Sequence, residues 1–165
     1  MFVGTNGPSG DRGRGAWLGQ TSPREPDMAV IDRRTWVEHL SQPECWYLLG
    51  LATVGRIGVL VDSAPEIYPV NFVVDEGTIV FRTDPGSKLR GLVRSPSVCF
   101  EADGISVDEH TGWSVLVKGR AAEVTTPEDR RTAAALPLQP WALGQKAHWI
   151  RIRPTEVTGR RIHRD

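Results

Sequence analysis

The residues best suited to chemistry lie in the segment "FRTDPGSKLR", residues 81–90. An apolar run ends at Thr83, the chain turns through Asp-Pro-Gly, and a hydroxyl–lysine pair follows at Ser87 and Lys88. Hydroxyls, an ammonium group and the N–H groups at a helix start can converge on a phosphate. The spacing is not that of a Walker loop. The segment therefore suggests a phosphate site, with an ordinary turn and a solvated lysine as the alternative.

The local chemistry of this corner supports a helix that starts just after the turn. Asp84 precedes a proline, which favours an extended backbone from which its carboxylate can cap the helix. Pro85 is expected in the first helical turn, where its missing N–H costs little. The N–H groups of Gly86, Ser87 and Lys88 are then free to bind an anion.

The segments around the corner follow mainly the period of β-strands. Asp-Glu-Gly at 75–77 is a hairpin signal. A short helix is expected over 87–94, because Leu89, Leu92 and Val93 fall on one helical face. The expected strands are 55–62, 65–75, 77–83, 97–103 and 112–124, followed by one or two strands within 148–162.

Further helices are expected near both ends of the strand region. A short helix is predicted over 32–40, and a second begins with Ser41 as N-cap, Glu44 three residues later and a proline in the first turn. A third, over 126–136, has threonine as N-cap and proline at its first position. This order predicts a mainly β fold with flanking helices, a small antiparallel barrel rather than alternating parallel units.

Composition limits the class of protein. The 165 residues are 39% hydrophobic and 24% charged, which fits one domain. The 20 basic and 20 acidic residues balance, which argues against a nucleic-acid or anionic-membrane partner. The sequence contains neither an apolar run of membrane-spanning length nor the hydrophobic centre of a signal peptide. Residues 1–30 are rich in Gly, Pro and Ser and are predicted to be a disordered tail before a domain at 31–165, with Met28 as an alternative start.

Cysteine and histidine patterns give no metal site and no catalytic residue. Cys45 and Cys99 lie in apolar surroundings and are expected to be buried, reduced thiols, which suggests the cytoplasm. The histidines show neither metal-ligand spacing nor a Ser/Asp partner; they are His39, His110, His148 and His163.

The hairpin "YPVNFVVDEGTIVFRT" followed by "DPGSKL" resembles the flavin-binding split-barrel family of pyridoxamine 5′-phosphate oxidase. It is most similar to the short bacterial branch that includes nitroimidazole-resistance proteins. The resemblance covers residues 44–162, and its landmarks are "VGRIGV", "PVNFVVD", "FRTDPGSK", "GWSVLVKGRA" and "WIRIRP".

This resemblance implies a homodimer of six-stranded antiparallel Greek-key split barrels with FMN at the interface. The phosphate would lie at the corner around Thr83, the ring along the strand near Pro69, and Ser114 and Trp141 would reach the cofactor across the interface. The cofactor-binding residues expected on this basis are Pro69, Val70, Asn71, Phe72, Arg82, Thr83, Gly86, Ser87, Lys88, Ser114 and Trp141.

The sequence also departs from the oxidase. Ile67 and Phe72 stand where the oxidase has basic residues, so two positive charges are missing, for one of which Arg56 or Arg82 could substitute. The oxidase's C-terminal substrate motif, Arg-Leu-His-Asp-Arg, is absent. Nitroimidazole-resistance relatives tend to have histidine at the position of Arg82. These differences argue against authentic pyridoxamine phosphate oxidation.

The function expected from the resemblance is a cytoplasmic flavoprotein that passes electrons from a reduced nicotinamide to a small acceptor. The absence of an evident acid or base fits this function, because the flavin ring itself supplies the redox step. Two alternatives remain open: a reductase of the same fold that uses a deazaflavin coenzyme, and a non-catalytic protein that binds flavin or haem.

Overall fold

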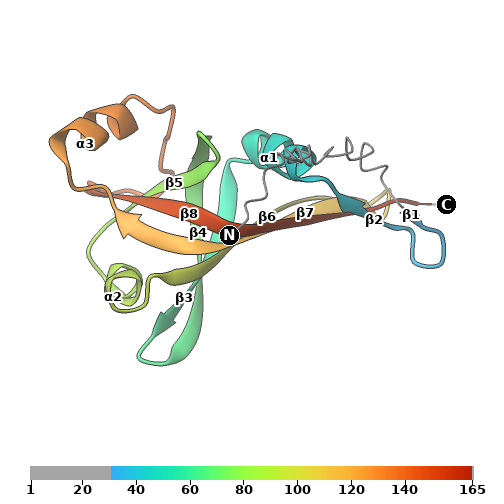
Figure 1. The fold of residues 1–165 in the computed structure, drawn as a ribbon, viewed down its shortest axis with the longest axis horizontal. Helices are drawn as coiled ribbons and strands as arrows, with labels where there is room; N and C mark the ends of the chain where they lie inside the picture. The colour runs from blue at the N-terminus through green and yellow to red at the C-terminus, as the bar shows by residue number, and fades with distance from the viewer. Residues whose placement is uncertain (1–30, 165) are drawn as a thin grey trace, which may run out of the picture.

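The computed structural model describes residues 31–164, in which six strands close into an antiparallel barrel (Figure 1). The strand order is β8-β5-β4-β3-β6-β7, and pairing of β7 with β8 completes the circle. This confirms the predicted mainly β split-barrel class. The strands are β3 (Val54–Val61), β4 (Ala64–Asp75), β5 (Thr78–Thr83), β6 (Ser97–Ser106), β7 (Thr111–Glu123) and β8 (His148–Ile162).

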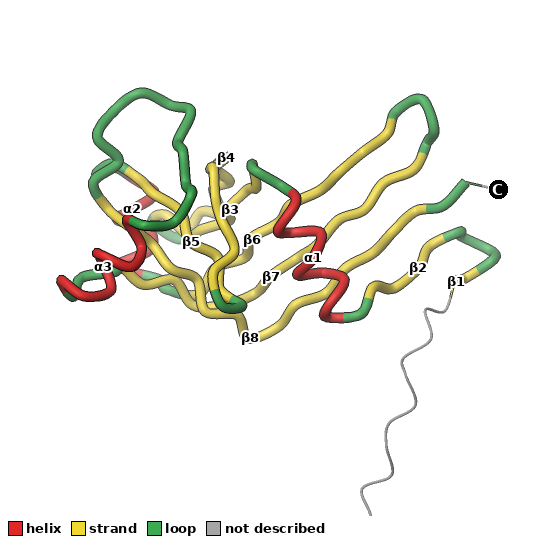
Figure 2. The backbone as a smooth tube through the Cα atoms, turned by 90° about the horizontal axis from the view of Figure 1, so that it is seen from above, coloured by secondary structure: helices red, strands yellow, loops and turns green. Residues whose placement is uncertain are grey.

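Two further strands, β1 (Ile31–Asp32) and β2 (Val37–Leu40), extend the sheet from the far half of β8 (Figure 2). The helix predicted over 32–40 is therefore wrong. The chain turns at Trp36, whose φ is +55°, and β2 then pairs with β8. The buried Glu38 joins the two strands, because its carboxylate accepts hydrogen bonds from His163 at 2.7 Å and Arg161 at 3.2 Å. These long-range contacts outweigh the local helical pattern.

The remaining helices agree with the sequence. Helix α1 (Gln42–Leu51) starts at Ser41, whose N–H and hydroxyl donate to the Glu44 carboxylate at 2.9 and 2.7 Å. These two bonds hold the pKa of Glu44 below its ordinary value. Helix α2 (Ser87–Arg94) follows β5, and α3 (Pro127–Ala134) begins with the N–H of Asp129 bonded to the Thr126 hydroxyl at 3.1 Å.

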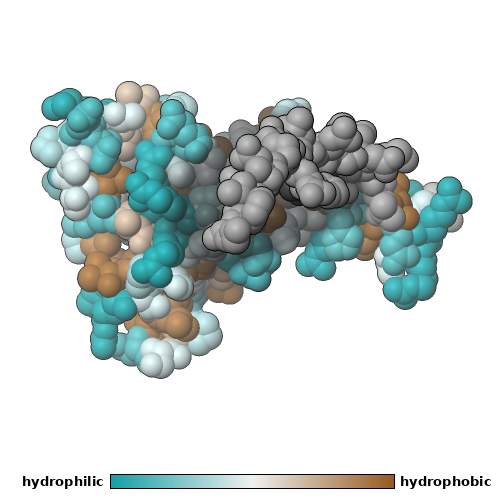
Figure 3. Space-filling model, viewed as in Figure 1, coloured by the Kyte–Doolittle hydropathy of each residue, from teal (hydrophilic) through white to brown (hydrophobic). Residues whose placement is uncertain are grey.

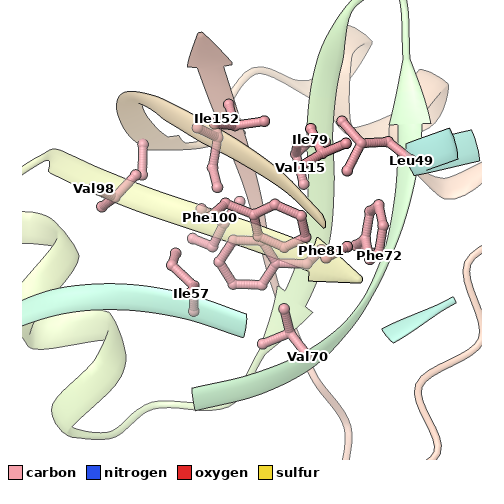
Figure 4. Packing of buried hydrophobic residues seen from close by; sticks show 14 of the residues in the cluster. Leu49, Ile57, Val70, Phe72, Ile79, Phe81, Val98, Phe100, Val115 and Ile152 are labelled. Atoms are coloured by element: carbon pink, nitrogen blue, oxygen red, sulfur yellow. The ribbon is translucent and has the colours of Figure 1, made fainter. Parts of the chain in front are cut away.

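The main core fills the barrel and extends under α1 (Figure 4). At its centre the rings of Phe72 and Phe100 meet edge to face, with centroids 4.7 Å apart. A second, smaller cluster lies on the other side of β5, where Val80, Leu138 and Trp149 pack together. Because both faces of β5 are covered, the strand leading into the predicted phosphate corner is held rigidly.

The two thiols differ in exposure. Cys45 is buried as expected, whereas Cys99 is exposed, so its predicted burial is wrong. Alternation along β6 turns Val98 and Phe100 into the core and Cys99 outward. Within residues 31–164, no helix is long and apolar enough to cross a membrane, and no cluster of side chains suits a metal ion. The predicted tail, 1–30, lies outside the described residues.

Candidate functional site

A small cavity of about 90 Å³ lies where β4, β5 and α2 meet. It collects six residues predicted from the sequence, and three more come from the long loop that follows α3. That loop arches from α3 back to the start of β8, as the orange segment in Figure 1 shows. The lining residues are Pro69, Val70, Asn71, Arg82, Thr83, Lys88, Pro140, Ala142 and Lys146.

The β4–β5 hairpin brings the predicted residues together. Its register pairs Phe72 with Phe81, so both rings enter the core while neighbouring side chains face outward. Asn71 lines the cavity wall in this way. Phe72 does not line this cavity, because its ring lies in the core, but it lines a neighbouring cavity; its backbone N–H donates to the Thr53 carbonyl at 3.4 Å.

The cavity is positively charged. Arg82, Lys88 and Lys146 line it, and none of its lining residues is acidic. Arg82 is fixed by bonds from its guanidinium to the carbonyl of Lys146 at 2.7 Å and to that of Gln145 at 2.8 Å. Its guanidinium carbon also lies 4.8 Å from the centre of the Trp149 ring, so the position of the charge is fixed. No carboxylate in the described structure pairs with it.

Lys88 presents its ammonium group at the start of α2, with Nζ 5.2 Å from the centre of the Tyr68 ring. Burial lowers the pKa of Lys88, and the positive charge of Lys146 lowers that pKa further, while Asp84 opposes the shift. Burial and a second cation both disfavour the charged form of this lysine, so an anion bound beside it would stabilise that form.

Asp84 does not cap α2, so this prediction is wrong. The helix begins at Ser87, Gly86 occupies the cap position with extended backbone, and no side chain of the described residues caps the helix start. The Asp84 carboxylate instead accepts two bonds of 2.6 Å from Lys146, one from its backbone N–H and one from Nζ. These contacts hold the pKa of Asp84 below its ordinary value. The ion pair with the Lys146 ammonium, together with the bond from its N–H, holds the carboxylate away from α2.

The two hydroxyls predicted to bind the phosphate, those of Thr83 and Ser87, both make hydrogen bonds within the protein. The buried Thr83 hydroxyl donates to the Asp84 carbonyl at 3.2 Å. The Ser87 hydroxyl lies 2.7 Å from that of Tyr68, which bonds to the Glu66 carboxylate. Since tyrosine has one hydroxyl proton and gives it to Glu66, Ser87 must be the donor to Tyr68. An anion at this corner would therefore be held first by the ammonium and guanidinium groups and by the N–H groups of α2.

Ser114 and Trp141 occupy different places. Ser114 lines a separate cavity of about 520 Å³ formed by the β6–β7 hairpin and the end of β8, so it does not join the corner within one chain. Trp141 does lie beside the hairpin, because its backbone N–H donates to Asn71 Oδ1 at 2.8 Å, and the residue is 71% exposed. Arg56, a candidate replacement for the oxidase's missing charge, is paired with Asp103 at 2.8 Å and lies outside the cavity.

Among the three cationic residues of the cavity, Lys146 is the one that the sequence did not reveal. It belongs to residues 137–146, which we call the strap because they cross the open side of the hairpin. Lys146 is 62 positions from its partner Asp84, and no local motif connects them. The strap also walls a second cavity of about 410 Å³ that reaches the end of α1 and shares Asn71. A small cationic cavity beside a larger, mainly apolar one suits a ligand with a phosphate and a flat ring.

Comparison with known proteins gives the family. The family model described as pyridoxamine 5′-phosphate oxidase matches residues 41–161. An uncharacterized protein of Mycobacterium tuberculosis is 36% identical over 134 residues, which cover 78% of this chain and 88% of that protein. The structure of an FAD binding protein from Mycobacterium smegmatis is 42% identical, with a TM-score of 0.63, covering 76% of this chain and 98% of that chain.

The structure of a provisionally assigned pyridoxamine 5′-phosphate oxidase from Corynebacterium glutamicum is also similar. It is 32% identical with a TM-score of 0.68, and the match covers 79% of this chain and 96% of that chain. The family match extends over nearly the whole barrel, including the hairpin, α2 and the strap that together form the cationic cavity. The chain therefore belongs to the pyridoxamine 5′-phosphate oxidase family.

Proposed function

We propose that the protein binds FMN, with the phosphate in the cationic cavity, and serves as a flavin-dependent oxidoreductase. The observation that carries this proposal is the lining of the cavity, in which three cationic side chains meet without a carboxylate. With the neighbouring Asp84 included, the formal charge around the cavity is two positive units, which matches a phosphomonoester dianion. The uncapped start of α2 adds backbone N–H donors and the positive end of the helix dipole.

The ring of the flavin would be held by the exposed side of β4. Pro69 is exposed and Asn71 lines the cavity that contains the cations as well as the larger apolar one, so the strand connects the two. When bound, the flavin supplies the redox step of the reaction. The chain's own residues would fix the phosphate, orient the ring and exclude water from one side of it.

A homodimer is part of this proposal. Large apolar side chains are exposed on the described structure, among them Val107 at 77% and Leu143 at 97%. Figure 3 shows hydrophobic surface between the polar side chains of the barrel. Ser114 would then reach a cofactor in the partner subunit rather than in its own. We place this dimer in the cytoplasm, because an exposed thiol such as that of Cys99 is best kept in a reducing compartment.

The test is an absorption spectrum of the purified protein, repeated after incubation with FMN and desalting. Retained flavin absorption supports the proposal, and oxidation of a reduced nicotinamide by the loaded protein then tests the oxidoreductase role. A protein that retains flavin without turnover would be a binder rather than an enzyme. A protein that retains no flavin would refute the proposed cofactor, and a deazaflavin coenzyme and haem would be tried next.

FAD is a second candidate, favoured by one observation. The relative from M. smegmatis that is 42% identical is described as an FAD binding protein. The small volume of the cationic cavity, about 90 Å³, fits a terminal phosphate better than a bridging pyrophosphate with an adenosine attached. Competition between FMN and FAD for the protein decides between the two: we expect FMN to bind more tightly, and tighter FAD binding would reverse the assignment.

A further inference from the structure

The strap is attached to the barrel at several points. Leu138 is buried in the small cluster beside β5, and the N–H of Trp141 donates to Asn71. At the other end, the carbonyls of Gln145 and Lys146 accept bonds from the guanidinium of Arg82. These attachments fix the position at which the Lys146 side chain enters the site.

Lys146 is held more firmly than a surface lysine. Its side chain is 19% exposed, and its Nζ lies 2.6 Å from Asp84 Oδ2. Gly144 covers this pair closely, since a Cβ at that position would lie 2.7 Å from Asp84 Oδ2 and 3.6 Å from Lys146 Nζ. Gly144 also has a φ of +123°, which glycine adopts readily. The strap is thus shaped to bring one ammonium and one carboxylate together at the rim of the cavity.

We propose that Lys146 is a second ammonium ligand of the phosphate, and that Asp84 is a built-in counter-anion that positions Lys146 and limits the affinity of the site. This inference rests on the proposed function and extends it to a residue that no local motif in the sequence indicates. Lys146 and Lys88 line the same cavity. Asp84 offsets one of their charges and so reduces the repulsion between them before a ligand is bound.

Loss of the two charges of this ion pair should change the affinity for FMN in opposite directions. Removing the Lys146 charge removes an attraction for the phosphate, whereas removing the Asp84 charge removes a repulsion. A purely structural ion pair behaves differently, because loss of either partner loosens the strap and weakens every ligand that the strap covers. The sign of the Asp84 effect therefore separates an electrostatic role from a structural one.

The experiment measures binding of FMN and of riboflavin, which lacks the phosphate, by quenching of flavin fluorescence. In Lys146→Gln we expect FMN to bind roughly tenfold more weakly, with riboflavin unchanged, because one charge-assisted contact is lost. In Asp84→Asn, which can still accept the bond from the Lys146 N–H, we expect FMN to bind about threefold or more tightly, with riboflavin unchanged. Lys146→Arg retains the charge and should keep FMN affinity within about threefold of the unmodified protein.

Lys118→Gln is the matched control, since Lys118 is also paired with a carboxylate, that of Glu156, but lies on β7 away from the cavity. It should bind both flavins as the unmodified protein does. Unchanged FMN affinity in Lys146→Gln, or weaker FMN binding in Asp84→Asn, would overturn the inference. Should Lys146→Gln fail to fold, Asp84→Asn and Lys146→Arg still decide the question.

The design separates this inference from the proposed function. If the unmodified protein binds FMN while the variants do not differ, the cofactor assignment stands and the role of Lys146 is refuted. If the unmodified protein binds neither flavin, the proposed function is refuted. Calorimetric titration with inorganic phosphate then tests the cationic cavity without a flavin. We again expect weaker binding in Lys146→Gln and tighter binding in Asp84→Asn.

Discussion

Replacement of Lys88 by glutamine is the most direct test of the proposed phosphate site. The side chain is half-buried, lies over the Tyr68 ring and lines the cavity, and glutamine keeps much of its length while removing its charge. A hydrogen bond to a charged group contributes about 1.5–3 kcal/mol, which corresponds to a roughly ten- to 150-fold change in affinity. Since Arg82 and Lys146 remain in the cavity, we expect the loss of FMN affinity to fall at the lower end of this range.

The assay is a fluorescence titration of Lys88→Gln with FMN and with riboflavin. Arg90→Gln is the control, because Arg90 is exposed on the same helix and does not line the cavity. The phosphate role predicts weaker binding of FMN alone. Equal weakening of both flavins would show that Lys88 supports the fold or the ring, and an unchanged FMN affinity would refute the reasoning altogether.

The same residue predicts a dependence on pH. Burial and the charge of Lys146 lower the pKa of Lys88 in the ligand-free protein, and a bound phosphate would raise it again. Above the lowered pKa, binding must take up a proton, so FMN affinity falls as the pH rises. We expect this decline to begin at a lower pH than the titration of exposed lysines. Lys88→Arg should move the decline to higher pH, because a guanidinium stays protonated.

Three further predictions concern stability, measured by urea denaturation. Gly144→Ala should destabilise the protein and weaken FMN binding, because its Cβ would collide with Asp84 and its φ of +123° is strained for alanine; unchanged binding would show that the strap adjusts. Ser41→Ala should cost about 1 kcal/mol by removing the hydroxyl bond to Glu44, and a loss below a few tenths would mean that the cap is not used. Glu38→Gln should cost about 1–3 kcal/mol, since Arg161 loses its ion pair with a buried carboxylate and His163 loses a hydrogen bond to it; an unchanged midpoint would contradict this account of the β2–β8 junction.

The sequence determined those features that depend on near neighbours. The hairpin turn at 75–77 and the caps at Ser41 and Thr126 involve groups within three positions of one another, so they can be recognised from residue type and spacing. The helix expected over 87–94 has the same bounds as α2. The strand-forming runs at 65–75 and 77–83, joined by the hairpin signal, likewise identified β4 and β5, which form one wall of the cavity.

Local patterns failed where a distant contact was stronger. Residues 32–40 have a helical pattern, yet pairing with β8 and the buried Glu38 make Val37–Leu40 a strand. Asp84 has the sequence context of a helix cap, yet the Lys146 ammonium and N–H draw its carboxylate away from α2. Cys99 lies in an apolar stretch, but the direction of its side chain depends on the register of β6 in the barrel.

Tertiary structure alone decided the charge of the candidate site. Lys88 and Lys146 come from segments far apart in the chain, and only closure of the barrel by β7 and β8, with the strap laid across the β4–β5 hairpin, brings both to one small cavity. Hydrophobic period and capping act over a few residues and are therefore written in the local sequence. Electrostatic interactions depend on distance in space and on burial, so a pair separated by 62 positions can be found only once the chain has folded.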